Sequence, residues 1–174
     1  MALVWVACAL AAVLAGSVVF VGARLRRRHQ RFFAAAPHLA PDGSPVLSQP
    51  RALYHGTRFA DGFALGAPAW KDPCVCDLWC TEAGLFVRRE GGGALLCIAF
   101  SEVREAALHR AFAPLAGKDL PMLRLRWRRG GESMETDLSV RGGMAGLESL
   151  RREIHLRQGN IAEQLAPLLG RPLP

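Results

Sequence analysis

The first 23 residues lack charged side chains, and the first 50 contain a single acidic residue, Asp42. Basic residues are absent before the apolar stretch 2–23 and crowd immediately after it, at Arg24, Arg26, Arg27, Arg28 and Arg31. A secretory signal peptide carries its positive charges in the opposite order, so the interpretation as a cleaved signal is disfavoured. As a helix the stretch would be about 33 Å long, enough to cross the hydrocarbon core of a bilayer. We therefore predict a transmembrane helix over residues 2–23.

The one-sided arginine cluster also predicts an orientation. By the positive-inside rule the N-terminus lies outside and the rest of the chain lies in the cytoplasm, which gives a single-pass protein of the inner (cytoplasmic) membrane. The bilayer is then the first expected partner. The arginines at 24, 26, 27, 28 and 31 are candidate contacts to anionic lipid headgroups, at about 1 kcal/mol per charge. The alternative that they only set the topology stays open.

Features of nucleic-acid-binding proteins are scarce. The net charge is +7, but residues 1–50 contribute +4 and the longer remainder only +3, so the basic character belongs mainly to the segment after the apolar stretch. Tyr54 is the single tyrosine, and the other aromatic residues follow the pattern of a buried core. Without basic stripes interleaved with stacking aromatics, we expect no nucleic-acid partner.

Catalytic and metal-binding motifs are also lacking, and we predict neither an enzyme nor a cofactor. The histidines do not occur in H-E-x-x-H or H-x-x-E-H arrangements, and the glycine clusters precede expected strands without a Gly-Lys-Ser. Cys80 and His55 would form a nucleophile pair only if folding brought them together. Cys74, Cys76 and Cys80 have no neighbouring histidine, and in a strand they share a face with Leu78. A buried row of reduced thiols is the favoured interpretation, and no metal site is predicted.

Composition divides the chain into four parts. The apolar stretch 2–23 is followed by a basic juxtamembrane segment and proline-rich linker over 24–50, where prolines recur at 37, 41, 45 and 50. Residues 51–158 form one domain, and 159–174 form a short helical tail after Gly159. Within the domain we expect strands at 53–59, 74–81, 85–89 and 94–100. The segment 103–109 suits either a strand or one or two helical turns.

A hairpin near the end of the domain carries the clearest local pattern. Residues 123–128 and 134–140 both alternate between apolar and polar side chains, with Gly130-Gly131 as a two-residue turn. The resulting register places Trp127 opposite Met134 on the inner face. On the outer face it places Arg126 opposite Glu135 and Arg124 opposite Asp137. Two members of the row Arg124, Arg126 and Arg128 are thus expected to be ion-paired. A phosphate-binding strip is the alternative use of that row.

The segment after the hairpin has helical periodicity. Met144, Leu147, Leu150 and Ile154 recur at spacings of three and four, which predicts an amphipathic helix that ends near Gly159. Six to seven short antiparallel strands closed by one C-terminal amphipathic helix is the element order of a pleckstrin-homology-like (PH-like) barrel. The predicted fold class is thus an N-terminal transmembrane helix followed by a mainly-β PH-like barrel.

Three segments resemble small bacterial single-span membrane proteins that carry one PH-like domain. They are residues 53–57 (LYHGT), 81–89 (TEAGLFVRR) and 125–132 (LRWRRGGE). Members of this group are often named only as membrane, export or transporter proteins, and some are encoded beside pyrimidine-synthesis genes. The resemblance extends over about residues 1–157 and implies the fold, but it brings no catalytic residues.

The function expected from these observations is a non-enzymatic, membrane-anchored interaction or scaffold module that holds a membrane or cytoplasmic protein partner. One alternative is a reader of anionic lipid headgroups, and another is an accessory subunit of a membrane transporter. Arg88, Arg89 and Arg128 are candidates for the interaction surface in either of the first two cases.

Overall fold

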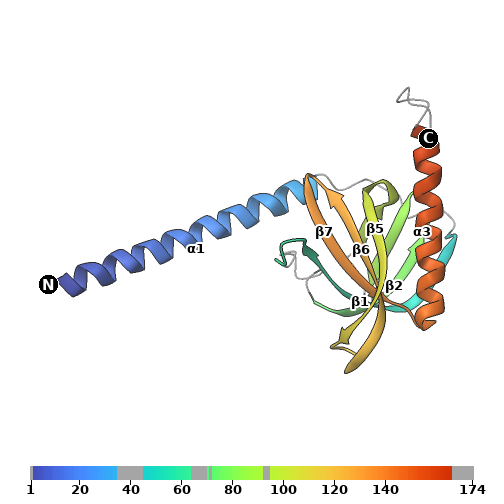
Figure 1. The fold of residues 1–174 in the computed structure, drawn as a ribbon, viewed down its shortest axis with the longest axis horizontal. Helices are drawn as coiled ribbons and strands as arrows, with labels where there is room; N and C mark the ends of the chain where they lie inside the picture. The colour runs from blue at the N-terminus through green and yellow to red at the C-terminus, as the bar shows by residue number, and fades with distance from the viewer. Residues whose placement is uncertain (1, 35–44, 64–69, 71, 92–94, 166–174) are drawn as a thin grey trace.

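The structure is a computed structural model that describes residues 2–34, 45–63, 70, 72–91 and 95–165. A long helix, α1 (Ala2–Ala34), precedes seven strands: β1 (Leu47–Phe59), β2 (Cys74–Cys80), β3 (Gly84–Arg89), β4 (Leu95–Ala99), β5 (Val103–Ala113), β6 (Lys118–Arg129) and β7 (Glu132–Ser139). A 3₁₀ turn, η1 (Phe100–Glu102), joins β4 to β5, and the helix α3 (Gly143–Leu165) follows β7. Figure 1 shows the strands gathered into one curved body, with α3 along one side and α1 extending away from it.

The seven strands form one antiparallel sheet in the order β4-β3-β2-β1-β7-β6-β5. The long strand β1 pairs with β2 through its first half and with β7 through its second half. The pairing with β7 shifts register between Tyr54 and Thr57, where Gly56 has a φ of 108°. A bulge with a glycine in this conformation bends a strand sharply, which lets one strand serve both halves of the barrel.

The core is built from the inward face of each strand and closed by α3. Leu147, Leu150 and Ile154 of the predicted helical stripe are fully buried, whereas Met144 is 41% exposed. Three buried polar side chains are satisfied by one another: Trp127 Nε1 donates to Thr136 Oγ1 at 3.0 Å, and Thr136 Oγ1 lies 2.7 Å from Thr57 Oγ1. The seven-stranded sheet and its helix are consistent with the predicted PH-like barrel.

Several local predictions are confirmed. The β6–β7 register pairs Trp127 with Met134, Arg126 with Glu135 and Arg124 with Asp137. Cys74, Cys76 and Cys80 lie buried on one face of β2. The ambiguous segment 103–109 is part of a strand, β5. The predicted break at Gly159 is wrong, because α3 continues to Leu165.

The predicted transmembrane helix over residues 2–23 is wrong. No helix in the described part of the chain is long and apolar enough to cross a membrane. Over residues 10–32 of α1, any stretch long enough to cross a bilayer contains at least three charged side chains, Arg24, Arg26 and Arg27. The prediction of a single-pass membrane protein is therefore wrong as well. The predicted localisation and orientation are not tested and remain predictions.

The arginine cluster lies on helix rather than on a linker. Residues 24–34 continue α1 as regular helix, and β1 begins at Leu47, inside the segment 24–50 that was interpreted as a basic linker. The C-terminal turns of α1 meet the barrel, as Figure 1 shows where the pale-blue end of α1 reaches β7. This contact is where the candidate site is found.

Candidate functional site

The end of α1 is held against the barrel by a cluster that we call the junction: Arg28, His29 and Phe32 of α1 with Phe59, Asp61, Trp127, Arg129 and Glu132 of the barrel. Arg28 lies at its centre. Its Nε and Nη2 atoms donate to Glu132 Oε2 at 2.9 and 2.7 Å, and Nη1 donates to Asp61 Oδ2 at 2.5 Å. The guanidinium carbon also lies 4.0 Å from the centre of the Phe59 ring. One side chain of α1 thus bridges the end of β1 and the start of β7.

The second contact of the junction is apolar. Phe32 is 1% exposed, and its ring centre lies 5.6 Å from that of Trp127. The guanidinium of Arg129 lies over both rings, at 5.1 Å from Phe32 and 4.9 Å from Trp127. His29 stacks on Phe59 one turn earlier. Because aromatic and cation–π contacts are directional, these pairs fix the angle at which α1 leaves the barrel.

Arg129 connects the junction to the seam of the barrel. It donates from Nε to Glu102 Oε1 at 2.7 Å and from Nη2 to Glu102 Oε2 at 2.6 Å. Nη2 also donates to the backbone carbonyl of Cys97. Glu102 in turn accepts from the backbone of Ala99, so that β4, η1 and β6 are joined through one buried ion pair.

The charges of the junction are stabilised by one another. Hydrogen bonding to Glu132 raises the pKa of Arg28 above its ordinary value, against the opposing effect of burial. Burial raises the pKa of Asp61, but the hydrogen bonds from Arg28 and from the backbone of Phe63, together with the charge of Arg28, outweigh it, and the pKa falls below its ordinary value of 3.8. Arg28 and Asp61 are therefore both charged at neutral pH.

A cationic cleft opens beside the junction, with a volume of about 470 Å³. Arg24, Arg27, Arg28 and Arg31 line it together with Phe20, Ala23, Asp61 and Glu132. Since Arg28 is engaged by both carboxylates, the positive charge offered to a ligand comes from the other three arginines. Arg26, the fifth of the predicted headgroup contacts, lies exposed on α1 and does not line the cleft.

The other predicted interaction residues lie on two strands, β3 and β6. Arg88 lies in β3, 3.4 Å from Asp77 and over the Trp79 ring at 5.3 Å. Arg89 is half-buried beside it, whereas Arg128 is exposed near the end of β6. β3 and β6 are not neighbours in the order of the sheet.

The outer arginine row is an ion-pair network. Arg124 donates to Asp137 at 2.8 and 3.0 Å, and Arg126 donates to Glu135 at 3.0 Å, as the register predicts. The sequence did not reveal Arg58 of β1, Glu105 and His109 of β5, which complete the network. Because Arg124 and Arg126, two of the three arginines of the row, have carboxylate partners, the row does not suit phosphate binding.

A histidine and a serine lie in contact on β1 and β7, but their geometry does not suit a nucleophile. His55 Nε2 is 3.0 Å from Ser139 Oγ, and Ser139 Oγ donates its hydrogen to the Pro121 carbonyl at 2.9 Å. Nε2 is then the donor to Ser139, so the imidazole cannot accept the serine proton. Cys80, which the sequence suggested as a nucleophile paired with His55, is also unsuited to that role, because burial raises the pKa of its thiol to about 12.

Among the described residues no group of three or more histidine, cysteine or acidic side chains is arranged to hold a metal ion. The expected lack of a metal or cofactor remains a prediction. In comparisons with known proteins, no family model and no curated protein matches this chain. The resemblance to bacterial PH-like proteins is likewise neither supported nor contradicted.

Proposed function

We propose that this chain is a non-enzymatic interaction module, in which the barrel holds α1 as an apolar arm for a partner protein. The observation that carries the proposal is a contrast along α1. Its last turns contact the barrel through Arg28, His29 and Phe32, whereas the large apolar side chains before them are exposed. These are Trp5, Val6, Leu10, Val13, Leu14, Val18, Val19, Phe20 and Val21. Exposed fractions at Trp5 and Val18 reach 75% and 72%.

An apolar surface of this extent is costly in water. Burying one large aliphatic or aromatic side chain contributes about 1.5–3 kcal/mol, and contiguous exposed patches of this kind mark interaction sites. The side chains point in all directions around α1, so a partner has to surround the arm rather than cover one stripe. A protein that offers several apolar helices has a surface of that shape.

The junction supports the proposal because it holds the arm in advance of binding. Arg28 and Phe32 fix the last turns of α1 to the barrel, and the helix continues from them without a break. A preformed arm loses less conformational entropy when it binds than a flexible segment would. Partner binding therefore requires no further ordering of α1.

Site-specific cross-linking tests the proposal. A photoreactive amino acid at Val18 of the full chain should give one discrete cross-linked partner protein in cells, whereas the same probe at Arg110 on the barrel surface should not. Leu14→Asp places a charge one turn from Val18 and should abolish that product. Gln30→Asp adds the same charge outside the apolar part and should not. Equal products at Val18 and Arg110, or a product that survives Leu14→Asp, would contradict the proposal.

The cationic cleft favours a second candidate function, binding to anionic phospholipid headgroups. Three arginines of the cleft have no carboxylate partner within ion-pair distance among the described residues, and the cleft has room for a headgroup phosphate. Co-sedimentation of the full chain with vesicles of anionic and of neutral lipid measures the difference due to charge. Replacing Arg24, Arg27 and Arg31 by glutamine should remove that difference, and replacing Arg88, Arg89 and Arg128 should leave it.

An unchanged preference of the Arg24/Arg27/Arg31 variant for anionic vesicles would exclude the cleft as a headgroup site. The accessory-subunit alternative depended on a membrane-crossing helix and is not proposed. The two remaining functions use different parts of α1, the apolar arm and the cleft at its C-terminal end, and the cross-linking and vesicle experiments separate them.

A further inference from the structure

A second cavity lies on the outer face of the barrel and is independent of the proposed function. It has a volume of about 370 Å³ and is lined by side chains from β1, β2, β6 and the end of β7. Its apolar lining comes from Leu53, Val75, Leu120 and Val140. Two arginines, Arg51 and Arg141, come from positions far apart in the chain and complete the lining. We call this cavity the arginine pocket.

The two arginines are exposed and unpaired, in contrast to the neighbouring network. Arg58, Arg124 and Arg126 each have a carboxylate within ion-pair distance. Within the described residues, Arg51 and Arg141 have none, and no acidic side chain lines the pocket. The arginine pocket therefore has an uncompensated charge of two beside an aliphatic wall, which suits an anion that carries an apolar group.

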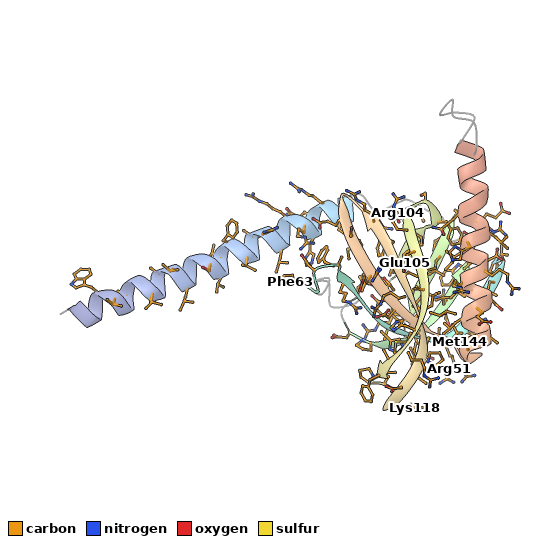
Figure 2. All side chains as sticks on the ribbon, viewed as in Figure 1. Arg51, Phe63, Arg104, Glu105, Lys118 and Met144 are labelled. Atoms are coloured by element: carbon orange, nitrogen blue, oxygen red, sulfur yellow. The ribbon has the colours of Figure 1, made fainter. Side chains whose placement is uncertain are left out.

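The backbone of β1 is distorted at Arg51. The β1–β2 pairing shifts register between Gln49 and Ala52, and Arg51 has a φ of 55°, the single non-glycine positive φ among the described residues. A left-handed conformation is unfavourable for arginine, and a bulge redirects the side chain of the residue that it displaces. Figure 2 places Arg51 at the end of the barrel remote from α1, near Met144 at the start of α3.

The side-chain hydrogen-bond donors of the pocket narrow the class of ligand. Ser139 is the one hydroxyl among the described lining residues, and its hydrogen is donated to the Pro121 carbonyl. The two guanidinium groups are thus the side-chain donors that the described lining offers, and a guanidinium pairs with both oxygens of a carboxylate. A phosphate has more oxygens to satisfy and gains nothing from the aliphatic wall.

We propose that the arginine pocket binds a small aliphatic carboxylate, with the carboxylate between Arg51 and Arg141 and the aliphatic part against Leu53, Val75, Leu120 and Val140. The site lies on strands of the barrel and is preformed. Its occupant is a free small molecule, distinct from the partner protein of α1.

Methyl-resolved NMR of the full chain, titrated with hexanoate, tests the proposal at residue resolution. Hexanoate should shift the methyl signals of Val75 and Val140 saturably. Hexanol, which lacks the charge, should bind at least about tenfold more weakly, since a charge-assisted hydrogen bond contributes about 1.5–3 kcal/mol. Inorganic phosphate, which lacks the aliphatic chain, should also bind more weakly. Methyl signals of Val13 and Val18 on α1 report non-specific binding to the arm and should not saturate with the same midpoint.

Variants separate binding from folding. Arg51→Gly suits the left-handed backbone, so the melting temperature should be unchanged or raised while hexanoate affinity falls at least about tenfold. Arg141→Gln should act similarly, and the double variant should show no saturable shift at Val75. A control with Arg104→Gln and Arg110→Gln on β5 removes equal charge elsewhere and should bind normally. Equal affinity for hexanoate and hexanol, or wild-type binding by the Arg51/Arg141 double variant, would overturn the proposal.

Discussion

Two adjacent arginines in β6 differ in their expected contribution to stability because their environments differ. Arg129 is buried between Phe32 and Trp127 with Glu102 as its partner, and Arg128 is exposed. Arg129→Ala leaves Glu102 and the Cys97 carbonyl without their donor, and it should lower the free energy of unfolding by about 3–5 kcal/mol. Arg128→Ala should change it by less than about 0.5 kcal/mol. Urea denaturation of both variants measures the contrast, and similar losses would show that Arg129 does not hold the seam.

His55 gives the barrel a pH dependence of known sign. Burial lowers the pKa of His55 below its ordinary value of 6.5, outweighing the raising effect of Asp137. The unfolded chain then binds a proton that the folded chain does not, so stability is complete above pH 6.5 and declines as the pH falls from 6.5 toward the lowered value. Urea midpoints at pH 7.5 and 5.5 should differ less in His55→Asn than in the wild type. An unchanged difference would assign the effect to other groups.

At the scale of the element, the junction makes the end of α1 a separate packing unit. Phe32→Ala removes the ring that lies on Trp127, and Arg28→Ala removes the bridge between Asp61 and Glu132. Each change should accelerate amide hydrogen exchange over residues 24–32 while leaving strands β2 and β3, which are remote from the contact, protected. Arg26→Ala, on the exposed side of the same helix, should leave exchange unchanged. Faster exchange throughout the barrel would mean that α1 and the barrel unfold together.

For the β6–β7 hairpin, the structure predicts a different effect of exchanging the charges of Arg126 and Glu135 than the register alone suggests. With Arg126 and Glu135 as an isolated pair, exchanging the two charges should restore stability. In the structure, Glu135 also faces Arg58 at 2.9 Å and Arg124 at 3.9 Å, and Arg126 also faces Glu105 at 2.8 Å. Arg126→Glu combined with Glu135→Arg therefore brings like charges together on both sides.

The double variant should unfold at a lower urea concentration than Arg126→Glu alone, because the new arginine at 135 faces two others. Full recovery to the wild-type midpoint would show that the two residues interact only with each other.

At the scale of the whole molecule, the cysteines report on global opening. Burial raises the pKa of both Cys76 and Cys80 to about 12, and Cys74 lies on the same buried face of β2. Cys8 is exposed on α1. At pH 8 a thiol reagent should modify Cys8 rapidly and the three β2 thiols only as fast as the barrel unfolds.

Mass spectrometry of the labelled peptides distinguishes the two rates of modification. In denaturant, all of these thiols should be modified rapidly. Rapid labelling of Cys76 in the native chain would contradict its burial. Zinc retained in stoichiometric amount after washing with a chelator would contradict the prediction that these thiols hold no metal.

Features decided by neighbours in the sequence could be predicted. The β6–β7 register follows from a two-residue glycine turn between two alternating segments, and a turn of that length leaves no freedom in pairing. The buried row of Cys74, Cys76 and Cys80 follows from strand alternation in the same way. Periodicity likewise predicted α3, although Gly159 did not end it, since one glycine in a helix costs only about 1 kcal/mol.

Features decided by contacts between residues far apart in the chain could not be predicted from the sequence. The hydropathy of the first 23 residues predicted a membrane span, and the structure instead describes a helix that carries the arginine cluster and docks on the barrel. Arg28 meets Glu132 across 104 positions of sequence, and Arg51 and Arg141 line one cavity although they are far apart in the chain. Sequence alone determined local alternation, periodicity and charge, because these depend on backbone geometry over a few residues. Tertiary structure decided which charges are neutralised and which stay free, because that depends on what the folded barrel brings within a few ångströms of each side chain.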